Sequence, residues 1–141
     1  MSLNKCVLIF SLISLFALCT CKKENPRAEK IALEAASAWL GIIDNGGYDE
    51  SWELTAEFFK GAVEKETWDK QLTAVRGPLG KMISREVVKK EYMTSVPGAP
   101  DGEYVFIQYK TSFENKINAI ETVTPMKDKD GQWRVSGYFI K

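Results

Sequence analysis

Hydrophobic side chains in the first half of the chain recur at the spacing of amphipathic helices. Residues 28–44 carry a broad apolar stripe with a period of about 3.6 residues. The stripe consists of Ile31, Ala35, Trp39 and Ile42, flanked by Ala32, Ala36, Leu40 and Ile43. A second helix is predicted over residues 49–60, aligning Trp52, Ala56 and Phe59, and a third over residues 64–76, aligning Trp68, Leu72 and Val75. Each helix is expected to bury its aligned face.

Beyond Pro78 the pattern changes to that of extended chain. Residues 104–113 alternate, and the face expected to meet the core carries Val105, Ile107, Tyr109, Thr111 and Phe113. Further strands are predicted over residues 85–96, 118–126 and 132–140, the first as a long edge strand or a strongly twisted strand with charges on both faces. In the last strand Trp133, Val135 and Phe139 are expected to share the core side. The sequence thus predicts an α+β fold with three N-terminal helices on one face of a curved four-stranded antiparallel sheet.

The N-terminus has the pattern of an export signal. Lys5 precedes an apolar run over residues 6–18, which is too short to span a bilayer as a helix. Leu18, Thr20 and Cys21 are placed as in a bacterial lipobox, so we expect lipidation of Cys21. The predicted organisation is a signal peptide with lipobox over residues 1–20, a tether over 21–27 and one α+β domain over 28–141.

This organisation predicts where the protein resides. A lipidated protein would be anchored in the bacterial cell envelope, on the periplasmic face of the outer membrane where two membranes exist. Ordinary signal cleavage near residues 17–20 would instead release a soluble secreted or periplasmic protein. The three cysteines, Cys6, Cys19 and Cys21, all lie in the leader and lipobox, so no disulfide framework is expected in the domain.

The amino-acid composition limits the kinds of binding and catalysis to be expected. The chain has 141 residues, with 19 basic and 19 acidic side chains. This neutral balance does not indicate nucleic-acid binding, which requires clustered positive charge. It has no histidine, which excludes Ser-His-Asp catalysis and His-containing metal sites. The Arg-Gly-Pro-Leu-Gly segment at 76–80 lacks a phosphate-loop pattern. Asp128, Asp130 and Gly131 resemble a fragment of a calcium loop, but the further spaced acids and the closing glutamate are missing. We therefore expect neither cofactor nor metal.

Several segments together resemble one bacterial family. They read AWLGIIDNGGYDESW, FFKGAVEKETW, RGPLG, PGAPDGEYVFIQYKTSFENK, ETVTP and GQWRVSGYFIK. In this order they resemble the domain of unknown function DUF4019 over residues 35–141. The resemblance implies a small exported or membrane-anchored protein, and it carries no catalytic residues. More loosely, helices followed by a curved antiparallel sheet resemble the NTF2-like or cystatin-like cone, a likeness of fold alone.

Aromatic and acidic side chains provide the candidate site. Trp39, Trp52 and Trp68 lie on the apolar faces of three predicted helices, where they could line a shared cavity or simply pack in the core. Glu121 alternates with apolar neighbours, which places one carboxylate on the inner face of the sheet. It could be a general base with a raised pKa, or it could pair with Arg76, Arg85 or Arg134. In the opposite strand phase Glu121 would face water.

Two classes of function remain at this point. The first is a non-catalytic binding module whose speculative pocket contains Trp39, Trp52, Trp68, Tyr109, Glu121 and Tyr138, and which takes an unknown protein, peptide or small molecule. The second is a cofactor-free enzyme in which Glu121 and either Tyr109 or Tyr138 transfer protons. A lone carboxylate without a clear second group favours the first class.

Overall fold

The fold combines four helices with one antiparallel sheet. The computed structural model describes residues 23–141. Its elements are α1 (Pro26–Asp44), α2 (Tyr48–Glu53), α3 (Glu57–Ala62), α4 (Lys65–Arg76), a 3₁₀ turn (Gly77–Leu79), β1 (Met82–Met93), β2 (Tyr104–Phe113), β3 (Lys116–Lys127) and β4 (Trp133–Ile140). The strands are ordered β1-β2-β3-β4, and each pair of neighbours is antiparallel. The predicted α+β class is confirmed, whereas the predicted signal, lipobox and Cys21 lie outside the described residues.

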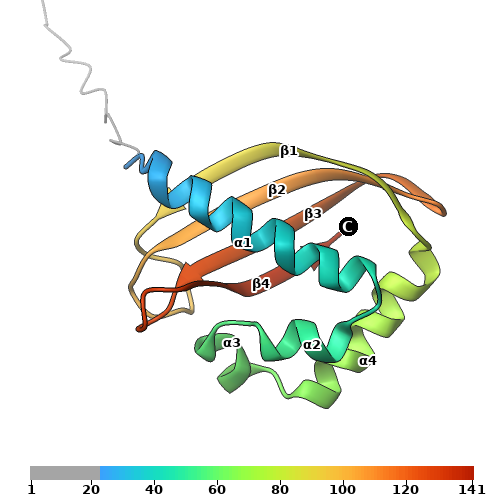
Figure 1. Ribbon diagram of the computed structural model, residues 1–141, viewed down its shortest axis with the longest axis horizontal. Helices are drawn as coiled ribbons and strands as arrows, with labels where there is room; N and C mark the ends of the chain where they lie inside the picture. The colour runs from blue at the N-terminus through green and yellow to red at the C-terminus, as the bar shows by residue number, and fades with distance from the viewer. Residues whose placement is uncertain (1–22) are drawn as a thin grey trace, which may run out of the picture.

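The helices are arranged around one face of the sheet. α1 crosses that face diagonally, and α2, α3 and α4 are grouped next to the C-terminal half of α1 (Figure 1). α1 begins at Pro26, and the side chain of the capping residue Asn25 accepts a hydrogen bond from the Ala28 amide at 3.1 Å. The 3₁₀ turn after α4 leads the chain into β1 at the edge of the sheet.

The prediction of three helices was wrong because the predicted helix over residues 49–60 is two short helices. The chain leaves helical geometry between α2 and α3, where the Ala56 amide donates to the Val135 carbonyl of β4 at 2.8 Å. The Thr55 hydroxyl donates to the Trp52 carbonyl at 2.7 Å, a local bond that competes with helix continuation. Pairing with the sheet therefore outweighs local helix propensity at this point.

On α1 and α4, the face that is buried is rotated relative to the face that the sequence predicted. On α1 the buried residues are Ala28, Ala32, Ala36, Trp39, Leu40 and Ile43. Ile31, expected at the centre of the stripe, keeps 39% of its surface exposed. On α4 the expected Val75 is 42% exposed, and Arg76 is buried in line with Trp68 and Leu72 instead. A cation thus occupies a position where the sequence pattern predicted an apolar side chain.

The sheet shows the predicted inner face on β2 and an irregularity in β4. Val105, Ile107, Tyr109, Thr111 and Phe113 are all buried, as predicted. On β4 the register shifts, because Val123 pairs with Tyr138 but Pro125 pairs with Val135. Two steps on β3 therefore correspond to three on β4, which is a β-bulge. The bulge turns Tyr138 toward the helices and leaves Phe139 59% exposed, so the predicted core position of Phe139 was wrong.

The core beneath α1 is dominated by aromatic rings in direct contact. The ring centroids of Trp39 and Tyr138 are 5.4 Å apart, those of Phe59 and Trp68 are 5.1 Å apart, and those of Trp39 and Trp68 are 6.1 Å apart. The Trp68 indole also donates to the Ser51 hydroxyl at 3.0 Å. Trp68 therefore joins α4 to α1, α2, α3 and β4.

Replacing Trp68 with alanine should strongly destabilise the fold. Loss of a buried tryptophan costs about 3 to 5 kcal/mol, because the surrounding side chains only partly fill the cavity. Val75→Ala is the matched control on the same helix, since Val75 is exposed and its loss should change stability little. Urea unfolding of both variants measures the difference, and a Trp68→Ala protein as stable as wild type would contradict this account of the core.

Candidate functional site

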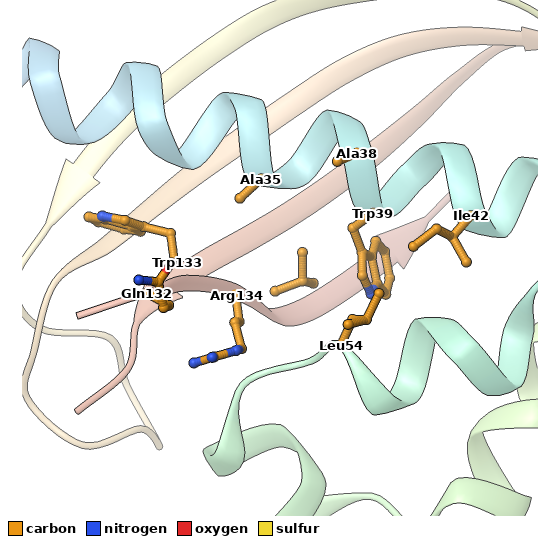
Figure 2. Close-up of a pocket in the computed structure, with 9 residues that line it drawn as sticks. Ala35, Ala38, Trp39, Ile42, Leu54, Gln132, Trp133 and Arg134 are labelled. Carbon is orange, nitrogen blue, oxygen red and sulfur yellow. The ribbon is translucent and has the colours of Figure 1, made fainter. Parts of the chain in front are cut away.

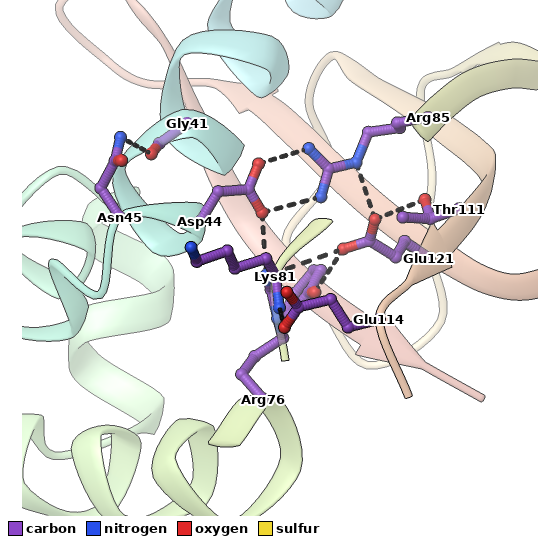
Figure 3. A network of polar contacts seen from close by, with 10 residues as sticks. Gly41, Asp44, Asn45, Arg76, Lys81, Arg85, Thr111, Glu114 and Glu121 are labelled. Carbon is purple, nitrogen blue, oxygen red and sulfur yellow. Dashed lines mark hydrogen bonds and ion pairs between the residues drawn. The ribbon is translucent and has the colours of Figure 1, made fainter. Parts of the chain in front are cut away.

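Four charged side chains meet in the interior at the C-terminal end of α1. Asp44 is the last residue of α1, Arg76 is the last residue of α4, and Arg85 and Glu121 lie on β1 and β3. Figure 3 shows these side chains converging between the helices and the sheet. The side chains of Arg76 and Glu121 are 3% and 0% exposed, and those of Arg85 and Asp44 are 11% and 15% exposed. We call these four residues the ion network.

Arg85 is the centre of the ion network. Its Nε donates to Glu121 Oε1 at 2.7 Å, while Nη1 and Nη2 donate to the two oxygens of Asp44 at 2.7 and 3.0 Å. Such a paired arrangement matches the planar fork of a guanidinium to a carboxylate. Arg76 adds a bond to Asp44 Oδ1 at 2.9 Å and lies 3.9 Å from Glu121 Oε2. Two cations and two anions therefore neutralise each other within the protein.

Glu121 is surrounded by donors on both of its oxygens. Besides Arg85, Thr111 donates to Oε1 at 2.6 Å and Tyr138 donates to Oε2. No part of the Glu121 side chain is exposed. Of the interpretations left open by the sequence, this geometry supports the ion pair, with Arg85 as the close partner and Arg76 as the more distant one.

Arg134, the third arginine considered for Glu121, pairs elsewhere. It donates to Asp128 and Asp130 at 2.8 to 2.9 Å, within the hairpin that joins β3 to β4. The bonds from Arg134 lower the pKa of Asp130 to about 2. Asp128 and Asp130 therefore stabilise a turn. Within residues 23–141, no group of three or more potential metal ligands is assembled.

The environment shifts the pKa values of groups in and beside the network. Burial alone would raise the pKa of Asp44, but hydrogen bonds from Arg85 and Arg76 outweigh it and hold the pKa below its usual value. Burial, and next the negative charge of Glu121, raise the pKa of Tyr138 far above that of a free phenol. Tyr138 therefore stays protonated and acts as a hydrogen-bond donor to Glu121.

The other predicted site residues lie around this network or in the core. Tyr109 is the β2 partner of Glu121, its hydroxyl is buried, and burial raises its pKa. Trp39 and Trp68 pack against Tyr138, and their indole N–H groups donate to the backbone and side chain of Ser51. Trp52 lies apart from them, donating to the Val63 carbonyl at 2.8 Å. The structure thus brings together Trp39, Trp68, Glu121 and Tyr138, with Tyr109 adjacent.

The sequence interpretation missed Asp44 as a member of the network. A carboxylate in the last turn of a helix meets the negative end of the helix dipole, which disfavours it. Such a placement is a sequence signal that a specific cation compensates the charge. Here Arg85 and Arg76 provide that compensation.

The sequence interpretation also missed an apolar groove beside α1. The groove has a volume of about 240 Å³ and lies between α1, the end of α2 and the start of β4. Its lining consists of Ala35, Ala38, Trp39, Ile42, Leu54, Gln132, Trp133, Arg134 and Val135. Figure 2 shows Trp133 at one end and Leu54 with Ile42 at the other, beneath α1. Leu54 is 47% exposed and Trp133 is half-buried, so apolar surface at both ends meets solvent.

A second, more polar hollow adjoins the groove at the N-terminal end of α1. Its volume is about 550 Å³, and it shares Gln132 and Trp133 with the apolar groove. Its charged lining residues are Arg27, Glu103 and Lys127. The two hollows therefore adjoin at Gln132 and Trp133, and we call the pair the concave strip, apolar at one end and polar at the other.

Comparison with known proteins places the chain in a family. The family described as "Protein of unknown function (DUF4019)" matches residues 35–138. The chain belongs to this family. No curated protein and no solved structure matches it. The DUF4019 match covers the last three helices, the C-terminal half of α1 and nearly all of the sheet, and therefore includes both the ion network and the groove. Among the described residues of this DUF4019 protein, no helix is long and apolar enough to cross a membrane.

The depressed pKa of Asp44 predicts a loss of stability in acid. The unfolded carboxyl has a pKa of about 3.9, so the contribution of Asp44 is present above that pH and is lost as pH falls through the lower folded value. Asp44→Asn should lose about 3 to 5 kcal/mol at pH 7, because two buried arginines lose their common partner. The difference from wild type should shrink below about pH 4.

Urea unfolding between pH 7 and pH 3 measures this dependence. Asp130→Asn is the control, since Asp130 pairs with an arginine at the surface and its loss should have little effect at pH 7. A difference between Asp44→Asn and wild type that stays constant down to pH 3 would refute the assigned role of Asp44.

Proposed function

We propose that this DUF4019 protein is a non-catalytic binding module of the bacterial cell envelope, held at a membrane by lipid on Cys21. Its binding site is the apolar groove between α1 and β4. The observation that carries this proposal is the half-buried Trp133 at one end of a hollow whose other end exposes Leu54 and Ile42. Concave apolar surface with a few polar groups at its rim is typical of binding sites.

The size of the lining side chains supports a binding role. Ala35 and Ala38 project only methyl groups from α1, which leaves room in the groove for an apolar group of a ligand. Burying apolar surface contributes about 25 cal/mol per Å². A ligand that covers Trp133, Leu54 and Ile42 would therefore gain affinity without any charged contact.

The ion network argues against the alternative of a proton-transferring enzyme. A general base must reach the substrate proton, and Glu121 has no exposed surface and already accepts hydrogen bonds from three donors. Tyr138 is equally committed, because its hydroxyl donates to Glu121. We therefore assign Glu121, Tyr138 and the two arginines to stability.

The position of the tether supports membrane attachment as part of the proposal. Four residues lie between Cys21 and Pro26, the first residue of α1, and the five Cα–Cα steps that join the two can span at most about 18 Å. A lipid on Cys21 would therefore hold the N-terminal end of α1 close to the membrane surface. We also propose a distant relation to NTF2-like domains, supported by a long helix crossing one face of a four-stranded antiparallel sheet.

Filling the groove should weaken binding of an apolar probe. Ala38→Gln adds a longer polar side chain to the lining, and we expect it to weaken binding of N-phenyl-1-naphthylamine about tenfold in fluorescence titrations of residues 23–141. Ala74→Gln, an exposed alanine on α4 outside the groove, should bind the probe like wild type. Equal probe affinity in both variants would exclude the groove as the site.

Lipidation of Cys21 is tested separately. Because Leu18 and Thr20 frame Cys21 as in a lipobox, a fatty-acid probe supplied to living cells should label wild type. Cys21→Ser should lose the label, whereas Cys19→Ser serves as the control and should keep it. Equal labelling of wild type and Cys21→Ser would rule out an anchor at this residue.

A further inference from the structure

The edge of β4 beside the groove is only partly covered. The segment over residues 54–56 runs parallel to β4, with a bridge between Thr55 and Val135 and a bond from the Ala56 amide to the Val135 carbonyl at 2.8 Å. This segment acts as a short additional strand at Val135. N-terminal to this segment the chain is helical, since α2 ends at Glu53. The extended segment therefore does not reach along the edge of β4 as far as Trp133.

Trp133 presents its backbone to this same open edge. Alternate residues of a strand direct their N–H and C=O groups to the same side, and Trp133 lies two residues before Val135. The pairing with β3 agrees, because Lys127, the partner of Trp133, directs its own amide away from β4 to the Glu103 carbonyl at 2.9 Å. Among the described residues, none outside the sheet forms a backbone bond with Trp133. One donor and one acceptor therefore remain available next to the groove.

The charge along the concave strip is uneven. At its polar end Lys127 pairs with Glu103 at 3.0 Å, whereas Arg27 forms no ion pair with another described residue. The lining of this end therefore carries one net positive charge. The other end, around Ala38, Ile42 and Leu54, is apolar.

We propose that this strip binds an extended peptide segment of a partner protein, which adds to the edge of β4 at Trp133. The inference rests on the proposed function, because it uses the same groove and specifies its ligand. The peptide continues the line of residues 54–56, pairs its backbone with Trp133, places an apolar side chain in the groove and directs an acidic side chain toward Arg27. Strand addition of this kind gains affinity from the backbone and specificity from alternate side chains.

The chemistry of the edge favours a strand over other ligands. A helix has already satisfied its internal backbone groups, and an apolar small molecule has none to offer, so neither would use the free donor and acceptor of Trp133. The length also fits. Arg27 and Ile42 are separated by about 22 Å along α1, at about 1.5 Å per residue. That distance corresponds to about six or seven residues of extended peptide.

Hydrogen–deuterium exchange of the full chain in lipid nanodiscs tests the inference. The probe is an equimolar mixture of hexapeptides, acetyl-Thr-Φ-Thr-Φ-Thr-Glu, in which Φ is Leu, Val, Ile or Phe. Without peptide, the Trp133 amide should exchange faster than the Arg134 amide. Neighbouring residues of a strand direct their amides to opposite sides, so the amide of Arg134 is directed toward β3. With peptide, exchange at Trp133 should slow at least tenfold, while the same peptides methylated on their backbone nitrogens should have no effect.

Two variants assign the side-chain contacts. Arg27→Gln should weaken the effect of peptides ending in Glu several-fold and leave unchanged the effect of peptides ending in Gln. Ala38→Gln should weaken both, and Ala74→Gln should weaken neither. Unchanged exchange at Trp133 with millimolar peptide, or equal slowing by methylated peptides, would overturn the inference. If the naphthylamine probe still binds in an Ala38-dependent way, the groove remains a binding site for a different ligand; if neither probe binds, the proposed function fails as well.

Discussion

The buried pairing of two carboxylates with two guanidinium groups determines how the helices sit on the sheet. Asp44, Arg76, Arg85 and Glu121 come from the ends of two helices and from two strands, and none of them has a partner within its own element. Taking these charges out of water is costly, so the arrangement is stable only when all four are present with close geometry. The network therefore ties the C-terminal ends of α1 and α4 to one place on the inner face of the sheet. Phe113 supports it from the sheet, because its ring lies 4.7 Å from the Arg76 guanidinium and faces the buried cation.

The groove is a consequence of where the network holds α1. With its last turn fixed above β1 and β3, α1 crosses the sheet diagonally and buries its alanine-rich face against the strands. The apolar surface of α1 is wider than the sheet can cover, so Ile31, Ala35, Ala38 and Ile42 remain on the flank toward β4. Because the segment over residues 54–56 closes the edge of β4 only at Val135, the flank of α1 and the start of β4 enclose an open apolar space. The same diagonal crossing thus produces a tightly packed end that holds the ion network and an open flank lined mainly by apolar side chains.

The sequence pattern predicted the secondary structure well because periodicity is a local property. It gave α1, α4 and all four strands, the inner face of β2 and the antiparallel order. It failed where a tertiary contact outweighed a local preference: at Thr55, where pairing with β4 interrupts a helix, and at residues 136–137, where a bulge exchanges the orientations of Tyr138 and Phe139. It also predicted Val75 rather than Arg76 in the core, since hydrophobicity alone does not show that a buried cation will meet two carboxylates. Glu121 and its possible arginines were identified from alternation, but the groove could not be, because it depends on the angle at which α1 crosses the sheet.

Because the ion network lies apart from the groove, we expect that substitutions in the groove can change its shape without unfolding the domain. Residues of the ion network have partners in several elements, so a substitution at any one of them leaves a buried charge unpaired. Residues of the groove, by contrast, contact solvent on one side, and a change of Ala35, Ala38 or Leu54 alters the shape of the hollow with little loss of buried surface. Trp133 belongs both to the sheet and to the concave strip, because it is the first residue of β4 and lines the apolar and the polar hollow. In the proposed peptide complex, its backbone, fixed by the sheet, would pair with the ligand, while the side chains around it would determine which ligand is preferred.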